Sequence, residues 1–243
     1  INNTLTIYTD NAMQDFESAE DQPWSEYRDQ IVQVILKEDV TRIGAYAFAG
    51  CEGLVGLEAN SAYTSIGDSA FEGCQKWMSI GYGGTVKEWL NVDVGANNEI
   101  LHESEISCTD GTIIDYGTGG DDIKWALTSI GNFVAVGSGD MYNYKYGTIY
   151  SDDQKAPWYA NRKNIKKVTL EEGITSVGEA AFAECGNAKT VKLPESVSVI
   201  EENAFVQCGV SKINLPSGLT KIGRAAFNRA DISSIEIPAG VTC

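Results

Sequence analysis

The sequence predicts a strand-rich α/β solenoid with short helical turns. A motif of the pattern Ile/Val-Gly/Glu-x-x-Ala-Phe occurs five times, with its phenylalanines at positions 48 and 71 and again at 182, 205 and 227. The coils are therefore about 22–23 residues long, a fixed period in the range typical of solenoids, in which each coil buries the apolar side of its neighbour. We expect all five phenylalanines in the core: Phe48, Phe71, Phe182, Phe205 and Phe227.

A longer repeat encloses the shorter one. Pro23-Trp24 recurs as Pro157-Trp158, and the same offset relates Cys74 to Cys208. We therefore predict two modules, residues 1–111 with a cap at each end and residues 112–243, which stop within a repeat. Because 235–242 read as half a repeat, we expect the natural chain to continue beyond Cys243, and Ile1 looks like the start of a trimmed chain.

The first module opens with a segment that does not follow the repeat. We expect a strand at Thr4–Tyr8, an acidic loop at Asp10–Asp21, a short helix at Pro23–Arg28 and a strand at Ile31–Leu36. Proline suits the first turn of a helix, where its missing N–H has no partner to lose. Trp24 is large enough to cover the apolar end of the first coil, so we interpret this segment as the N-terminal cap.

The same module closes with a second cap, because the period breaks between Trp77 and Cys108. Thr85 and Glu88 form a capping-box pattern, which predicts the start of a short helix. A further turn of helix is expected at 98–101, followed by a closing strand at 105–108.

The second module opens differently. We predict a glycine-rich turn at Gly117–Asp121, strands at Ile123–Leu127 and Phe133–Val136, and a loop at Tyr142–Lys155 that is longer than its counterpart in the first module. In each following coil a strand such as Thr190–Leu193 ends at a proline, because proline has no backbone N–H to donate to a neighbouring strand. A second extended piece follows, and the Ala-Phe pair is expected in a tight helical turn.

Composition excludes some functions. The net charge is −16, whereas nucleic acids and anionic membranes require a basic protein surface. No apolar run approaches the ~18 residues that a membrane span needs.

The cysteines follow the repeat. Cys51, Cys74, Cys185 and Cys208 each lie three positions after a repeat phenylalanine, so they share one structural position. We expect them to be small buried side chains and all six cysteines of the chain to be reduced. The alternative is a zinc site, but its ligands are usually two to four residues apart, and these are not.

No catalytic, cofactor or metal site is predicted. The single histidine, His102, has no Gly-x-Ser-x-Gly motif to accompany it, and the 34 carboxylates are interpreted as solvated surface charges. Calcium stays open as an alternative, because carboxylates crowd the loop at 10–21 and its counterpart at 151–153, although no EF-hand spacing is present.

The repeats resemble a known family. Their pattern, best seen in 193–208 and 215–227, is similar to the BspA-like leucine-rich repeats of bacterial surface proteins. Glu201 stands where that pattern has glycine, and Ala230 where it has cysteine; Glu201 indicates that the glycine position does not demand a positive φ. The resemblance implies a right-handed leucine-rich-repeat solenoid, a secreted or cell-surface location, adhesion to host proteins or other cells, and no catalytic residues.

Charge differs between the modules and predicts where a ligand binds. Residues 1–111 hold 19 acidic and 5 basic side chains, and residues 112–243 hold the other 15 and 13 of the 34 and 18 in the chain. Strand alternation places Val168, Leu170, Val191, Leu193, Ile213, Leu215, Ile235 and Ile237 in the core. It then places eight candidate ligand-facing residues outward: Lys167, Thr169, Thr190, Lys192, Lys212, Asn214, Ser234 and Glu236.

The equivalent outward positions of the first module hold no lysine; they are Gln33, Ile35, Gly56 and Glu58. We therefore predict a non-enzymatic protein-binding module that uses the second module, with host or bacterial surface proteins or acidic glycans as partners. Three alternatives remain: the lysines only keep an exposed sheet soluble, the chain is a structural spacer, or it is an accessory module of a larger carbohydrate-active enzyme.

Overall fold

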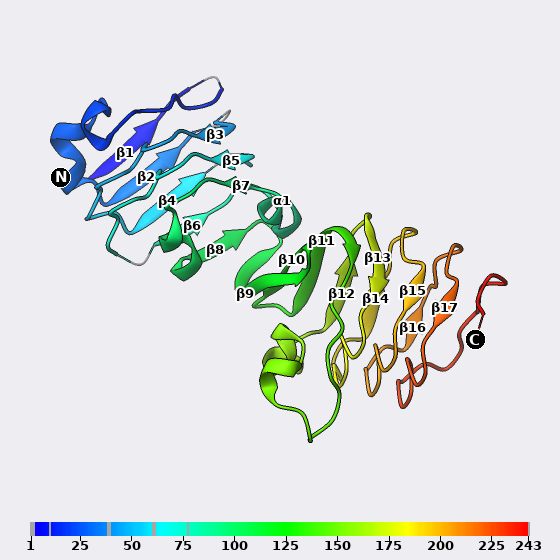
Figure 1. Ribbon diagram of the computed structural model, residues 1–243. Coiled ribbons are helices and arrows are strands. Elements are labelled where there is room, and N and C mark those ends of the chain that lie inside the picture. Colours follow the sequence, from blue (N-terminus) through cyan, green and yellow to red (C-terminus); the bar gives the residue numbers. More distant parts are fainter. Residues whose placement is uncertain (1–2, 10, 38–39, 60–61, 77, 243) are drawn as a thin grey trace. The chain divides into compact units, whose positions relative to one another are not determined.

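The computed structural model describes residues 3–9, 11–37, 40–59, 62–76 and 78–242. It divides into two compact units, unit 1 (Ile1–Ile113) and unit 2 (Ile114–Cys243), each described here by itself. Both are strand-rich with few and short helices (Figure 1). The expectations made for Ile1, Asp10, Trp77 and Cys243 lie outside the described residues.

Unit 1 is built around a parallel sheet whose strands follow one another in chain order (Figure 1). Gln33 pairs with Gly56 and Gly56 with Ser79, so successive strands are offset by one repeat. A second, smaller sheet forms farther along each repeat. The larger sheet holds β1 (Thr4–Ile7), β2 (Gln33–Leu36), β4 (Gly56–Ala59), β6 (Ser79–Gly81) and β8 (Glu105–Cys108); the smaller holds β3 (Arg42–Ile43), β5 (Ser65–Ile66) and β7 (Asp93–Val94).

Unit 2 repeats this arrangement after an antiparallel start. Lys167 pairs with Thr190 and Thr190 with Lys212, again at an offset of one repeat. β11 is long enough to pair with β12 along its first half and with β13 at its end. The strands are β9 (Gly111–Gly120, which begins in unit 1), β10 (Asp122–Thr128), β11 (Asn132–Asp140), β12 (Lys167–Leu170), β13 (Ile174–Val177), β14 (Thr190–Lys192), β15 (Val199–Ile200), β16 (Lys212–Ile213) and β17 (Lys221–Ile222).

The glycine-rich turn predicted at Gly117–Asp121 is wrong, because residues to Gly120 belong to β9. Gly120 is there for space rather than for a turn. A Cβ on Gly120 would lie 2.5 Å from the carbonyl oxygen of Asp140, whereas one on Gly119 would only be in ordinary contact with the rings of Trp158 and Trp125. Glycine inside a strand often marks such a close approach.

The helices largely follow the expectations. α1 (Val86–Leu90) begins at the predicted capping box, in which Thr85 and Glu88 satisfy each other's backbone N–H groups. The helix expected at Pro23–Arg28 is a 3-10 helix that starts slightly later, η2 (Ser25–Gln30). The other 3-10 helices are η1 (Ala19–Asp21), η3 (Glu99–Glu103), η4 (Asp152–Gln154) and η5 (Pro157–Asn161).

The Ala-Phe segments are not the helical turns that we predicted. The backbone N–H groups of Asn203, Phe205 and Gln207 donate to carbonyls of the next repeat, at 2.7–3.0 Å. Alternate amides therefore form another ladder between repeats, and a helix would have used them internally. Asn203 and Gln207 accordingly adopt the left-handed region, with φ of 56° and 53°, and residues at the same positions of the other repeats do so too.

Aromatic rings form the centre of each unit. Phe48 stacks on Phe71, with ring centroids 5.6 Å apart. In unit 2, Phe182, Phe205 and Phe227 stack in series at 5.6 and 5.4 Å. The repeat cysteines Cys51, Cys74, Cys185 and Cys208 are buried and unpaired beside them, as predicted, and the sixth cysteine lies outside the described residues.

Candidate ligand-binding surface

The outward face of β12, β14 and β16 carries most of the predicted ligand-facing residues. Strand alternation buries Val168, Val191 and Ile213 on the other side of these strands. Seven of the eight predicted residues are exposed and Thr169 is half-buried. Asn214, Ser234 and Glu236 are exposed but lie outside the strands.

The predicted core is wrong at Ile237. Leu193, Leu215 and Ile235 are half-buried and pack against the core, whereas Ile237 is 49% exposed. No further repeat covers Ile237 in the described part of the chain, so its side chain lacks the neighbour that buries the equivalent positions of earlier repeats.

The strand register arranges the three outward lysines as a triangle. Lys167 and Lys212 both lie in the row of Thr190, one on each side of it, while Lys192 pairs with Thr169 in the next outward row. With strands about 4.8 Å apart, Lys167 and Lys212 lie about 10 Å apart and Lys192 about 8 Å from each. Among the described residues, none of the three forms a salt bridge.

Three further exposed lysines, which sequence reasoning missed, border this triangle at the ends where the strands begin. Lys166 immediately precedes β12, and its carbonyl accepts the backbone N–H of Lys189 in the next repeat at 3.0 Å. Lys163 lies in the preceding turn, and its carbonyl accepts the side-chain amide of Asn187 at 2.7 Å. The repeat offset from 166 to 189 could have found this pair. We name the six the lysine surface: Lys163, Lys166, Lys167, Lys189, Lys192 and Lys212.

Carboxylates lie mainly beyond the other ends of these strands. Glu172 accepts the backbone N–H of Glu195 at 3.1 Å, and Glu195 accepts the N–H of Ser217 at 3.1 Å, so they hold successive turns together. On the lysine surface itself, Lys189 is paired with Asp231 at 2.7 Å. Positive and negative charges are thus largely separated along the strand direction.

Unit 1 presents a different outward face. Gln33 lies over Gly56, because a Cβ there would collide with its side-chain amide, and Glu58 lies over Gly81 in the same way. Ile35 is half-buried and Glu58 is exposed. The outward residues of β2 and β4 therefore include a carboxylate and no lysine.

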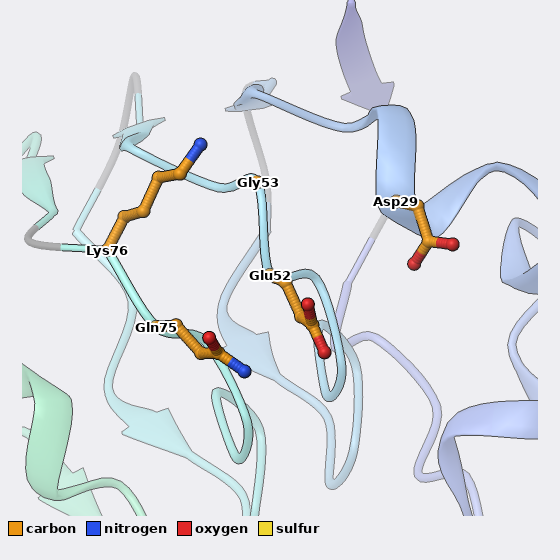
Figure 2. Close-up of a pocket in the computed structure, with 5 residues that line it drawn as sticks. All are labelled: Asp29, Glu52, Gly53, Gln75 and Lys76. Atoms are coloured by element: carbon orange, nitrogen blue, oxygen red, sulfur yellow. The ribbon is translucent and has the colours of Figure 1, made fainter.

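The described residues also outline two hollows in unit 1, neither of which has the character of a small-molecule site. The larger, about 410 Å³, is lined by Asp29, Glu52, Gly53, Gln75 and Lys76 from successive turns (Figure 2). Its four side chains are all exposed. Ligand pockets instead combine apolar walls with a few convergent polar groups. The smaller hollow, about 260 Å³, lies beside Trp24 and Tyr27.

The thiols are poor nucleophiles. Burial raises the pKa of Cys51 and Cys208 to about 11 and that of Cys74 to about 12, and raises the pKa of Cys185 well above its ordinary value. Only the thiolate attacks, and it is scarce at neutral pH.

His102 is exposed on η3. Within the described residues no three His, Cys, Asp or Glu side chains gather to hold a metal, and no helix is long and apolar enough to cross a membrane.

Six copies of the BspA type leucine-rich repeat region match the chain, over residues 26–91 and 155–243. The chain belongs to this family. The repeats described above, with their parallel strands and few helices, thus constitute a leucine-rich-repeat fold.

Two solved structures are similar to this BspA-type chain. One is a leucine-rich repeat protein from Eubacterium ventriosum, with 27% identity over 53% of this chain and 39% of that one and a TM-score of 0.43. The other is a leucine-rich cell surface protein from Faecalibacterium prausnitzii, with 21% identity over 96% of this chain and 47% of that one and a TM-score of 0.32. The chain thus spans less than half of either protein. No curated protein matches it.

Proposed function

We propose that this chain is a non-enzymatic binding module of a bacterial cell-surface or secreted protein, and that it mediates adhesion to host proteins or other cells. Its repeats of about 22–23 residues would wind as a right-handed solenoid, which presents a long and rigid face to a ligand. The family membership supports this proposal, because BspA-like repeats are those of bacterial surface proteins.

The observation that carries the proposal is the triangle of Lys167, Lys192 and Lys212. The three side chains are exposed on adjacent strands and form no salt bridge among the described residues, on a chain whose net charge is −16. A local positive field of this kind attracts acidic partners and raises their association rate. Exposed lysines that only keep a sheet soluble would have no preferred partner, so the two interpretations differ in a binding assay.

The test is binding of the whole chain to a panel of purified extracellular-matrix and serum proteins and to cultured host epithelial cells. The variant Lys167/Lys192/Lys212→Glu should lose most of the binding, since it reverses the local charge. The matched control Lys145/Lys221/Arg224→Glu makes the same change in net charge at exposed sites of unit 2 outside β12, β14 and β16, and should bind as the parent does.

Two outcomes contradict the proposal. Equal binding by the parent and the lysine variant would show that the ligand lies elsewhere. Absence of binding to every member of the panel and to cells would favour the spacer instead.

A further inference from the structure

The lysine surface has a composition that fits one class of ligand better than others. Resting on the proposed function, we propose that it binds a linear polyanionic polysaccharide, such as a sulfated glycan, laid across successive repeats. Four features carry this inference: the charge of the surface, its repetition from strand to strand, what lies between the lysines, and the kind of cation that supplies the charge.

The surface is strongly positive locally. All six lysines are exposed, and Asp231, bound to Lys189, is the only carboxylate in a salt bridge with them among the described residues. Glu172 and Glu195 lie beyond the opposite ends of the strands and are engaged by backbone N–H groups, while the exposed Glu236 lies after the last strand. A polyanion would therefore be held near the ends where the strands begin.

The positive charges recur along the stack of repeats. Lys166 and Lys189 occupy adjacent positions in successive repeats, joined by the backbone hydrogen bond between them. Lys167 and Lys212 share one row across three strands. Neighbouring strands are about 4.8 Å apart, so this row of lysines runs at right angles to the strands. An extended polymer that carries charge along its length can follow such a row, whereas a small anion would contact only one or two lysines.

The residues between the lysines are polar. Thr169, Thr190 and Asn214 offer hydroxyl and amide groups, which hydrogen-bond to sugar hydroxyls and sulfates. Protein–protein interfaces instead place aromatic or aliphatic anchors at their centre. The exposed isoleucines Ile130 and Ile237 lie in the turn between β10 and β11 and after β17, so neither lies on β12, β14 or β16.

The choice of cation points the same way. All six are lysines, which are compact, strongly hydrated point charges on flexible stems. Arginine is the usual choice for desolvated contacts with a folded partner. The one arginine near the first of these repeats, Arg162, is already bound to Glu184 at 3.1 Å and stacked on Tyr159. The hydrated point charges of these lysines suit a hydrated ligand with many anionic groups.

The experiment is a titration of the whole chain with heparin-derived oligosaccharides of graded length. Desulfated heparin and dextran are the arms without sulfate, and poly-L-glutamate represents an acidic polypeptide. We expect binding to the sulfated oligosaccharides to strengthen with length and to weaken at least tenfold between 50 and 300 mM NaCl, as salt shortens the Debye length to below about 10 Å. Desulfated heparin, which keeps only its carboxylates, should bind much more weakly than the sulfated oligosaccharides, and the neutral dextran should not bind.

Two triple variants and a control locate the site. Each exposed charge contributes modestly, so three together should change the affinity about tenfold or more. Glutamine keeps length and polarity, and thermal melts check that all variants fold. The sheet variant is Lys167/Lys192/Lys212→Gln, the edge variant is Lys163/Lys166/Lys189→Gln, and the control, expected to bind within twofold of the parent, is Lys145/Lys221/Arg224→Gln.

The inference is overturned if folded sheet and edge variants bind heparin oligosaccharides as the parent does, or if poly-L-glutamate binds more tightly than these oligosaccharides do. The inference also fails if the chain does not bind the sulfated oligosaccharides. If the protein panel or the cells still show binding that depends on Lys167, Lys192 and Lys212, the proposed function survives and only the ligand class is wrong. If neither assay shows binding, both proposals fail.

Discussion

Trp158 stacks on Phe182, with ring centroids 5.8 Å apart and ring planes 28° from parallel. Its indole N–H donates to the carbonyl of Ala181 at 2.7 Å. In unit 1, Trp24 stacks on Phe48 in the same way at 6.1 Å and donates to Ala47. Each tryptophan therefore serves as the first rung of a phenylalanine ladder. Further rings pack on it in turn, with Phe16 at 5.7 Å from Trp24 and Phe133 at 4.8 Å from Trp158.

Replacing these tryptophans should destabilise the two units unequally. Trp158 is fully buried, whereas Trp24 is partly exposed. Trp158→Ala should lower the free energy of unfolding of unit 2 by about 3–5 kcal/mol, and Trp24→Ala should cost unit 1 less. Urea unfolding followed by circular dichroism measures both, with the exposed Tyr27→Ala as a control near zero. An equal cost at the two tryptophans would contradict their assignment as unequally buried rungs.

The position of a phenylalanine in the ladder should set its contribution to stability. Phe205 is fully buried between Phe182 and Phe227, while Phe227 is half-buried. Since truncating a buried phenylalanine costs about 3–5 kcal/mol, Phe205→Ala should lower the melting temperature more than Phe227→Ala. Equal shifts would mean that the order of stacking is wrong.

Gly178 is required by close approach, although Glu201 fills the same position in the next repeat. A Cβ on Gly178 would lie 2.0 Å from the carbonyl oxygen of Tyr142, whereas one on Gly186, in the same repeat, has nothing within 4 Å. Gly178→Ala should therefore destabilise the chain by about 1–3 kcal/mol through forced backbone shifts. Gly186→Ala should be close to neutral in the same melting experiment. If both variants melt like the parent, the backbones are not in contact at this point.

The thiols should be reduced and slow to react. The raised pKa values of the four buried repeat cysteines, and of Cys108 at about 12, leave little thiolate at pH 8. A thiol reagent should label the folded chain slowly and count six thiols in denaturant without reductant. A count of four or fewer would reveal disulfides in place of a ladder.

The periodic part of the fold could be predicted because apolar and polar residues alternate within each repeat and so indicate which side chains point inward and which outward. Val168 and Leu170 were expected in the core and are buried, and the capping box at Thr85 begins α1 as expected. The sequence also located the buried cysteines, since their spacing copies that of the phenylalanines.

The errors share a physical cause, which is that contacts between repeats override local preference. The Ala-Phe segments lack helical structure because Phe205 donates to Ala226 of the next repeat instead of to its own turn. Gly120 reads as a turn residue but lies in a strand, where the carbonyl oxygen of Asp140 leaves no room for a side chain. Lys166 and Lys189 were missed since simple alternation points them inward, yet both lie just before their strands and are exposed.

The central claim is that the ligand binds the outward face of β12, β14 and β16, and lysine footprinting tests it most directly. The whole chain would be acetylated with and without bound heparin oligosaccharide and with and without attachment to epithelial cells, and modification quantified by mass spectrometry. Protection of Lys167, Lys192 and Lys212, with Lys145 and Lys221 unprotected, is the predicted result. Protection confined to other lysines, or no protection at saturating ligand, would contradict the account.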